Sequence, residues 1–543
     1  MVKRGNRGSE GKISTFGLSP FQNSIYRALW IASFFSYVGA AMNDVGASWL
    51  MTSIAPNPLL VSLITTASAL PIFLFALPSG ALSDIFDRRN ILLITCVYML
   101  TISTILGILT LVGIITPTIL LILTFALGAG TTMIRTPIIP TMSGLVSRME
   151  LPAALTLSAV AANIGRAIGP SIGGFIVAAI APWAVFFLNS VSFIGMILVL
   201  IRVPKKSELQ ENSHMEENII EAIRAQVRYV RYSQAAHVLI VRAGLFVICG
   251  SAILSLLPVL AKHVLGLNST GFGLLLGAFG AGGVVGGLVI LPKLRQMISV
   301  ESLITGSTVL LALSVFLMAV VREFSLICIV MGLGGVAWIT IFSNLYVTGL
   351  KSAPKWIGAR ILAVYLLIIN GGLAIGSVIW GLIANLSGIS ITLMLASLAL
   401  VASILARRWY KTTVVNDLDL TPSMHWPLPQ LATSVSPDDG PVLVQIEYLI
   451  DISKSNEFKA AITEFKNLRL RDGATNWGIF YDVGNPDHYI ETFIADSWAE
   501  HLRYHERFTR ADKEIEDRVL AFHIGKAAPK VNHFIYDSVS TEK

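Results

Sequence analysis

Charged side chains are scarce in this sequence: Asp, Glu, Lys and Arg make up only 13% of its 543 residues. Soluble globular proteins carry about 25%, and a water-soluble chain of this length would form several domains, each with a charged surface. The scarcity therefore excludes a soluble protein for most of the chain. The hydrophobic residues, at 54%, exclude a disordered chain. Most of the chain is therefore expected to lie in a lipid membrane.

Other features are also missing. The three cysteines, Cys96, Cys249 and Cys328, lie in apolar runs without the spacing of a disulfide framework or a metal site, so we interpret them as small apolar residues. The first 20 residues contain no apolar run, which argues against a cleaved signal peptide and favours a cytoplasmic basic arm over residues 1–25. No GxxxxGK[ST] phosphate loop occurs, so ATP-driven activity is not expected.

The charge that is present is unevenly distributed. Residues 442–543 contain 13 basic and 17 acidic residues, whereas residues 1–441 contain 27 basic and 16 acidic residues in four times the length. The sequence therefore predicts a membrane body followed by a small soluble domain. Because the basic excess belongs to the membrane body, we attribute it to topology and anionic lipid and not to nucleic-acid binding.

Twelve segments are long and apolar enough to cross a bilayer, which requires about 20 residues per helix. They are Tyr26–Ser53, Leu59–Leu82, Asn90–Gly113, Pro117–Gly144, Pro152–Ile180, Trp183–Ile201, Val238–Ala261, Thr270–Leu291, Val300–Val320, Ser325–Leu350, Gly358–Leu386 and Ile389–Leu405. We expect two six-helix bundles, residues 26–201 and 238–406. A linker, 202–237, joins them, and residues 407–441 lead to the soluble domain at 442–537.

The charges of the loops alternate along the chain. Loops after spans 1, 3, 5 and 11 carry no Lys or Arg, and Lys262 and Arg322 are exceptions after spans 7 and 9. Loops after spans 2, 4, 8 and 10 are basic, with Arg88, Arg89, Arg148, Lys293, Arg295, Lys351 and Lys355. Positive loops stay inside, so both termini are predicted to be cytoplasmic. Within the linker, Ile219, Ile220, Ile223, Val227 and Val230 recur at helical spacing, which favours an amphipathic helix on the inner membrane face, with a calmodulin-type target as the alternative.

The end of the second span carries Gly80, Asp84, Arg88 and Arg89. This pattern resembles the signature loop of the major facilitator superfamily, although Ile85 and Asp87 replace a usual basic residue and a usual glycine. The resemblance implies an all-α polytopic transporter in which these residues hold an inner gate. The alternative is that Arg88 and Arg89 only mark topology.

The fifth span contains Gly165, Gly169, Pro170, Gly173 and Gly174. Glycines four residues apart allow helices to approach closely. The motif resembles that of the superfamily's exporters, and residues 20–410 are similar to the branch that contains bacterial enterobactin exporters. The resemblance implies a bacterial inner-membrane antiporter that uses protons to drive efflux of a small amphiphilic molecule, such as a siderophore, drug or metabolite. It implies no cofactor.

Three charges lie deep in the first bundle: Asp44, Arg135 and Arg166. Each costs several kcal/mol in hydrocarbon unless it is paired or hydrated. Rough depths favour a pair of Asp44 with Arg166 and leave Arg135 for an anionic substrate. Asp44 is the candidate for proton coupling, and its alternative role is a helix-end group near outer water.

The tail predicts strands at Val442–Ile450, Trp477–Asp482, Tyr489–Ala495 and Asn532–Tyr536, and helices at Phe458–Leu470 and Ser497–Ala521. The βαββαβ order is that of a ferredoxin-like α+β fold.

The stretch around Arg471-Asp472-Gly473 and the FIADSWAEHLRYHERF segment resemble the antibiotic biosynthesis monooxygenase family, whose domains pair into α/β barrels. His501 and His505 share a helix face, but two ligands are poor evidence for a metal or haem, and a solvated or interface pair is favoured. We therefore expect a dimerising module without catalytic or metal-binding residues. A fused enzyme acting on the exported compound and a sensor that binds without transporting are the alternatives.

Overall fold

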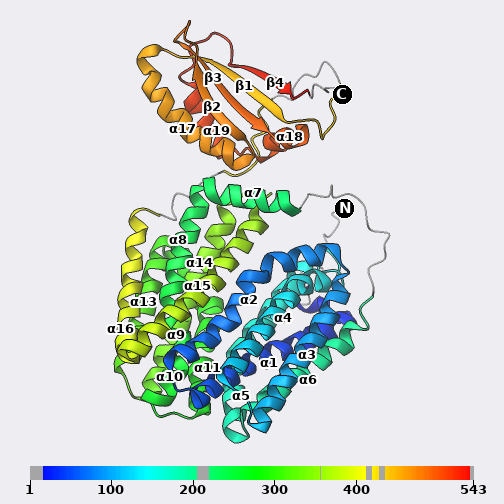
Figure 1. Cartoon of the computed structure of the whole chain (residues 1–543), viewed down its shortest axis with the longest axis vertical. Coiled ribbons are helices and arrows are strands. Elements are labelled where there is room, and N and C mark those ends of the chain that lie inside the picture. The colour runs from blue at the N-terminus through cyan, green and yellow to red at the C-terminus, as the bar shows by residue number, and fades with distance from the viewer. Residues whose placement is uncertain (1–15, 205–218, 355, 411–418, 427–433, 538–543) are drawn as a thin grey trace, which may run out of the picture. The chain divides into compact units, whose positions relative to one another are not determined.

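A computed structural model describes residues 16–204, 219–354, 356–410, 419–426 and 434–537 of the chain (Figure 1). The chain forms two compact units. The first unit takes the chain up to residue 213, residues 242–345 and residues 366–408, and the second takes the remainder. Each unit is described by itself below.

Six long helices form the first bundle of the first unit. Proline at the first helical position suits α2, α4 and α6, because the N–H that it lacks would have no partner there. The Asn23 side chain caps α1 by accepting from the backbone N–H of Ile25 and Tyr26. The helices are α1 (Ser24–Ile54), α2 (Pro58–Ile85), α3 (Arg88–Val112), α4 (Pro117–Ser143), α5 (Leu151–Ala179) and α6 (Pro182–Leu200).

Helices of the second bundle are more broken. The seventh span is interrupted near Pro258, which cannot donate a helical hydrogen bond, and the eighth contains a π-helical turn before Pro292. The elements are α8 (Gln234–Gly250), α9 (Ala252–Ser255), α10 (Leu257–Val259), π turns Leu260–Val264 and Gly286–Ile290, α11 (Ser269–Val285), α12 (Leu291–Met297), α13 (Val300–Val320), α14 (Phe324–Lys351), α15 (Gly358–Ser387) and α16 (Ile389–Ser403).

Twelve helices in the described part of the chain are long and apolar enough to cross a membrane, which confirms the predicted number. Their ends agree with the predicted ends within four residues, with two exceptions: the second apolar span ends at Ala76 instead of Leu82, although helix α2 runs on to Ile85, and the eighth continues to Met297 instead of Leu291. It continues because Pro292 stands in the first turn of α12, where proline is tolerated. Below, the basic side denotes the end of the bundles that carries the α2–α3 turn, and the opposite side carries the α1–α2 turn.

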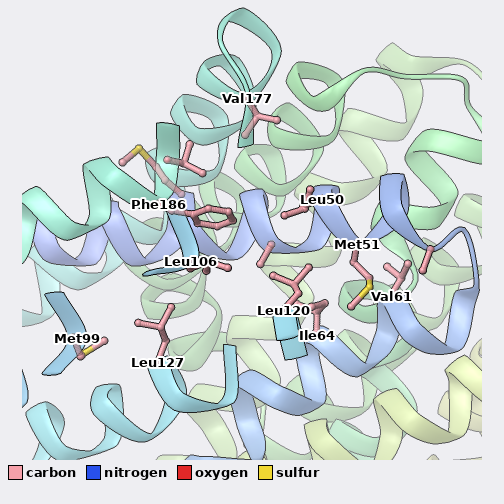
Figure 2. Close-up of a cluster of buried hydrophobic side chains, with 14 of the residues drawn as sticks. Leu50, Met51, Val61, Ile64, Met99, Leu106, Leu120, Leu127, Val177 and Phe186 are labelled. Carbon is pink, nitrogen blue, oxygen red and sulfur yellow. The ribbon is translucent and has the colours of Figure 1, made fainter. Parts of the chain in front are cut away.

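The core of the first bundle is built from large apolar side chains. Helix α1 packs against α5 and α6, α2 against α4, and α3 against α4 and α6. Figure 2 shows part of this core, to which α1 contributes Leu50 and Met51, α2 contributes Ile64, and α6 contributes Phe186. In the second bundle α13 packs against α16.

The second unit contains an antiparallel four-stranded sheet in the order β2-β3-β1-β4. Strands β1 (Val442–Leu449), β2 (Thr475–Tyr481), β3 (His488–Ala495) and β4 (Lys530–Ile535) alternate with α17 (Ser455–Asp472), α18 (Trp498–Arg507) and α19 (Arg510–Leu520). In the central pair, Val442 of β1 lies opposite Ala495 of β3. The predicted elements are confirmed except in one place, because the expected helix Ser497–Ala521 is two helices.

The break between α18 and α19 has a local cause. Phe508 is extended, with ψ at 122°. Thr509 and Asp512 then form a capping box, in which each side chain accepts the other residue's backbone N–H. Thr509 therefore starts a new helix, which the apolar periodicity alone did not reveal.

The sheet has one covered and one accessible face. Val444, Tyr448 and Phe493 point into a core with Phe458 and Phe465 of α17. On the other face, Leu443 of β1 lies opposite Ile494 of β3 and Phe534 of β4, and Leu443 and Phe534 are exposed. Helix α7 (Ile219–Tyr232) of the linker also belongs to this unit.

Candidate functional site

Three ionisable side chains of the first bundle lie inside membrane-spanning helices. Asp44 belongs to α1, Arg135 to α4 and Arg166 to α5. Each of the three side chains is exposed instead of packed in the apolar core. Since an ion against hydrocarbon costs several kcal/mol, these side chains require either counter-ions or water.

Arg166 is hydrogen-bonded to neutral oxygen atoms. Its Nη2 donates to Asn163 Oδ1 at 2.9 Å, and its Nε donates to the Ala162 carbonyl at 3.3 Å. Among the described side chains, no acid lies within ion-pair distance of Arg135 or Arg166, and no cation lies within that distance of Asp44. The expected pair of Asp44 with Arg166 is therefore wrong for this conformation. The helices begin earlier than expected, which places Asp44 about 30 Å along α1 and Arg166 about 22 Å along α5 from their basic-side ends.

Tyr37 of α1 faces α5, the helix that carries Arg166, although the sequence did not single it out. Its hydroxyl is within electrostatic range of Arg135 and Arg166, and the two guanidinium groups are within range of each other. The face of α1 that carries Tyr37 therefore points toward α4 and α5. Asp44 follows Tyr37 by seven residues, so it lies on the same face about 10 Å further along the helix. One tyrosine in an aromatic-rich span gives no signal by itself.

The motif expected to form a gate lies at the end of α2 and the start of α3. Arg89 donates from Nε to the Leu200 carbonyl at 2.9 Å and from Nη2 to the Ile201 carbonyl at 2.8 Å, which caps the end of α6. Asp87, which replaces the usual glycine, accepts from the Arg89 backbone N–H and caps α3. Arg89 thus joins two helices of the same bundle.

The other residues of this motif are Arg88, Gly80 and Asp84. Arg88 is half-buried. A side-chain carbon at Gly80 would meet no atom within 4 Å. Asp84 belongs to α2, and its side chain lies outside the described part of the structure.

The glycines of the span-five motif bring α5 against α1. A side-chain carbon at Gly165 would lie 2.8 Å from Tyr37 Cβ, one at Gly169 would lie 2.7 Å from Ala41 Cβ, and one at Gly173 would lie 2.8 Å from Met42 Cα. Glycine at these positions therefore permits a backbone approach that alanine would obstruct.

The same helix also contacts the second bundle within the first unit. A side-chain carbon at Gly174 would collide with the backbone of Ser269 and Gly273 in α11. A side-chain carbon at Gly273 would likewise collide with the Pro170 carbonyl. Ser171 Oγ donates to the Gly273 carbonyl at 3.4 Å. Pro170 and Gly174 therefore belong to an interface between the bundles.

Further contacts between the bundles lie toward the opposite side. Thr66 of α2 donates from Oγ1 to the Ala374 carbonyl of α15 at 3.0 Å. Lys262 Nζ donates to Ser53 Oγ at 2.7 Å and stands over the Trp49 ring. Lys262, an exception to the charge pattern, thus has a structural partner.

The second bundle contains a buried ion pair that the sequence analysis missed. Arg242 Nη1 of α8 lies 2.6 Å from Glu301 Oε1 of α13, and both side chains are buried. Arg407 approaches the same carboxylate at 3.7 Å. Glu301 stands in the first turn of its helix, so it was not counted as an acid inside a span.

The C-terminal domain contains a histidine cluster. The His501 ring of α18 lies 5.1 Å from that of His505 and 4.7 Å from that of His533 in β4. His501 is 2% exposed, and neither of its ring nitrogens has a hydrogen-bond partner. Of the expectation of a solvated or interface pair, the solvated alternative is therefore wrong for His501. Among the described residues, no group of three or more His, Cys, Asp or Glu has the geometry to hold a metal.

A buried ion pair lies nearby in the same domain. Arg469 Nε donates to Glu491 Oε1 at 3.2 Å, and both side chains are almost fully buried. Tyr448 and Trp477 also donate to this carboxylate, and Arg469 donates to the Tyr504 hydroxyl. Charged residues in a predicted helix and strand gave no sign of this burial.

Helix α7 packs against α17 within the second unit. Arg228 Nη2 lies 3.3 Å from Glu500 Oε1 of α18. Tyr229 is buried and donates to the Ser352 carbonyl, while Arg507 of α18 stands 4.7 Å over the Trp356 ring. The linker helix and the α14–α15 turn thus meet the helical layer of the C-terminal domain. The sequence predicted an apolar stripe along this helix. Val227 of that stripe is exposed. The side chains of Ile219, Ile220 and Ile223 lie outside the described part of the structure.

Solved structures share the fold of this chain. The nucleoside transporter NupG matches with a TM-score of 0.58 at 11% identity, covering 71% of this chain and 98% of that one. A bacterial homologue of the human lysosomal transporter Spinster, in an inward-facing conformation, matches with a TM-score of 0.58 at 11% identity, covering 75% of this chain and 98% of that one. The twelve-helix fold is therefore that of these transporters.

Sequence relatives specify the family. The staphyloferrin A transporter of Staphylococcus aureus is 25% identical over 280 residues, which cover 50% of this chain and 68% of that protein. The uncharacterized MFS-type transporter YfiS of Bacillus subtilis is 23% identical over 175 residues, covering 30% of this chain and 37% of that protein. The transmembrane secretion effector family model matches residues 15–541. The chain belongs to this family, and it is a membrane transporter of the major facilitator superfamily.

Proposed function

We propose that this transporter exports a small amphiphilic molecule, of which a siderophore is the first candidate, by alternating access driven by proton entry. The observation that carries this proposal is the placement of Asp44. Its carboxylate lies inside a span, on the face of α1 turned toward α4 and α5, and no described cation pairs with it. A carboxylate so placed can take up and release a proton between two conformations.

The proposed direction of transport draws on the comparisons and on the contacts of the helices. The family is described as one of secretion effectors, and a relative is named a staphyloferrin A transporter. The span-five glycines bring α5 close to α1 and α11, and the bundle contacts named above lie toward the opposite side. We propose that this conformation opens to the basic side, which we place in the cytoplasm of a bacterial inner membrane together with both termini.

The gate residues have a proposed role of their own. Gly80 and Asp84 belong to the last turns of α2, and Arg88 and Arg89 begin α3, so the motif stands on both sides of the α2–α3 turn on the basic side. Arg89 of α3 already caps the end of α6. Helices α3 and α6 can therefore move as one body when the basic side of the transporter closes. We propose that Asp84 and Arg88 complete the gate in the closed conformation.

For the C-terminal domain we propose a ferredoxin-like fold that pairs with a second copy. Leu443, Phe480 and Phe534 expose apolar surface on the open face of the sheet, which a second copy of the domain could cover. We assign no reaction to this domain, because the enzymatic alternative rests on resemblance alone.

Transport by inside-out membrane vesicles tests the main proposal, with staphyloferrin A as the first substrate offered. We expect accumulation inside vesicles with an acidic lumen and its loss on adding an uncoupler. D44N should abolish the proton-driven accumulation while leaving the protein in the membrane. The matched control is D517N, an exposed acid on α19, which should transport normally. Full proton-driven accumulation by D44N would reject the role of Asp44.

A further inference from the structure

The end of the seventh span carries a lysine whose partners belong to the other bundle. Lys262 Nζ donates to Ser53 Oγ at 2.7 Å and stands 5.2 Å from the centroid of the Trp49 ring. Both partners lie in the last two turns of α1, beside the α1–α2 turn. Among the described side chains, no acid lies within ion-pair distance of Lys262. The ammonium is therefore held by a hydroxyl and an aromatic face, which bind a cation less tightly than a carboxylate does.

The same indole ring also meets an aromatic side chain of the second bundle. The rings of Trp49 and Phe272 of α11 are stacked, with their centroids 5.9 Å apart and their planes inclined by 23°. Phe272 is buried. Val259 of α10, three residues before Lys262, belongs to the buried apolar cluster that includes Met51 of α1. The end of α1 is therefore in contact with two separate elements of the second bundle.

The second bundle presents Lys262 from an irregular segment. The seventh span breaks into α9 and α10 and ends in the π turn Leu260–Val264, which contains Lys262. Such turns interrupt the regular helical hydrogen bonds and are frequent at functional sites. A transporter that alternates between two conformations needs a contact that can break on the side that is closed at a given stage. A cation on a short irregular turn can leave its partners without the unfolding of either bundle.

We propose that Lys262, Trp49 and Phe272 form the gate that closes the opposite side of the transporter in this conformation, with the Lys262 ammonium as its latch. Opening this side withdraws the ammonium from the Trp49 ring and unstacks that ring from Phe272. The released charge meets water and not hydrocarbon, because the latch lies at the end of its span beside the exposed Ser53. This inference rests on the proposed alternating access, because it names the residues that close one side.

Distances between the bundles in the purified full chain, reconstituted in lipid nanodiscs, test the gate. In a chain whose three cysteines are replaced, nitroxide labels at P56C and L386C report on the opposite side by pulsed electron paramagnetic resonance. Pro56 lies in the α1–α2 turn and Leu386 near the end of α15, and both are exposed. Helices α2 and α15 are in contact through Thr66. We therefore expect short distances to predominate in the chain with an unaltered gate.

Variants of the latch should shift this distribution. K262M keeps the apolar stem but loses the charge, and it should raise the ratio of long to short distances by about tenfold. W49L should raise the ratio similarly, and adding K262M to W49L should change little more, because the cation and the ring form one contact. K262R should have a smaller effect, because it keeps a cation over the ring. The matched control is R322Q, because Arg322 donates to Ala319 and Ser390 of its own bundle, and it should leave the distances unchanged.

The outcomes separate this inference from the export proposal. Long distances in the chain with an unaltered gate, or distances that neither K262M nor W49L changes, would each overturn the gate. Additive effects of K262M and W49L, or an equal effect of R322Q, would overturn the latch. Unchanged distances in these variants together with proton-driven accumulation in vesicles would overturn the gate and leave export intact. The expected distances in a chain that accumulates no substrate would instead support the gate and contradict the proposed function.

Discussion

At the scale of single residues, the surroundings of His501 and His505 in the C-terminal domain lower the pKa of both rings. Burial, and then the neighbouring His533, lower the pKa of His501 to about 3. The same two causes lower the pKa of His505 to about 4. In the unfolded chain both rings would titrate near 6.5. Between these pH values the unfolded state therefore binds more protons than the folded state.

This difference predicts acid sensitivity of the domain. Stability rises with pH wherever the unfolded state binds more protons, so the domain should lose stability as the pH falls from about 6.5 to about 4. The loss should approach about 1.4 kcal/mol per pH unit for the buried His501 and be smaller for the half-buried His505, whose charge water screens. Amide hydrogen exchange of β1 and β3 in the full chain, measured at pH 7.0 and 5.0 and corrected for intrinsic rates, would show it.

The comparison for this prediction uses two variants. H501L removes the buried titrating ring and should make the protection of β1 and β3 less dependent on pH. H488Q alters a half-buried histidine on the open face of the sheet and should leave the dependence as it was. Equal pH dependence in H501L and the unaltered chain would refute the assignment.

Some of the site residues could be predicted from the sequence, and others could not. The spacing of Asp44, Arg135 and Arg166 within apolar spans was visible, because isolated ions stand out in lipid-facing segments. Tyr37 was not visible, because a phenol in an aromatic run costs little in a membrane. Partners such as His533 for His501 come from a distant strand, and no local pattern encodes which distant side chain will be adjacent.

At the scale of secondary-structure elements, the helix that links the two halves is joined to the C-terminal domain. In the isolated domain Glu500 would still have Arg507 and Arg503, and α7 adds Arg228 to this cluster. Burial and then Arg507 act on the pKa of Glu500 in opposite directions, and the net result is a pKa below its usual value. Glu500 is therefore ionised at neutral pH, and a cation on α7 is favourable.

Reversing the charge of Arg228 should loosen this contact. R228E would place a second carboxylate beside Glu500, and we expect the opening of α7 and α18 to become easier by about 2 kcal/mol. Local hydrogen exchange of the two helices in the full chain measures that change. R224E, an exposed arginine one turn earlier, should have almost no effect. Equal effects of R228E and R224E would show that the charge contact contributes nothing.

Element prediction succeeded where one physical signal dominated. Apolar length alone specified the twelve membrane helices, because lipid requires a full span of internally hydrogen-bonded backbone. It failed where a local cap competed with periodicity, as at Thr509, and where Pro292 stood at a tolerated position. The surroundings of α7 were not predictable, because the residues that contact it, such as Ser352 and Glu500, are far apart in the sequence.

At the scale of the whole transporter, the two bundles are joined by helices that approach within backbone distance. Helices α5 and α11 cross with small residues on both sides, including Gly174, Gly273 and Gly277. Small residues allow such contact without interlocking side chains. An interface of this kind can separate and re-form, as alternating access requires.

A disulfide across this interface would hold the described conformation. A side-chain carbon at Gly277 would lie 3.4 Å from Ser171 Cβ, close to the spacing of about 3.8 Å between the Cβ atoms of a disulfide. In a chain whose Cys96, Cys249 and Cys328 are replaced by serine or alanine, S171C with G277C should therefore cross-link under mild oxidation. Cross-linked protein should bind substrate from one side of the membrane and transport none, because α5 and α11 must part for the opposite side to open.

Reduction should restore transport to the level of the unoxidised double variant, which separates the cross-link from any effect of the substitutions. The two single variants, S171C and G277C, should transport equally under oxidising and reducing conditions. Undiminished transport by fully cross-linked protein would mean that α5 and α11 stay together throughout the cycle. The substrate would then have to cross by a motion that leaves this glycine-lined interface closed, and the alternating-access proposal would fail with it.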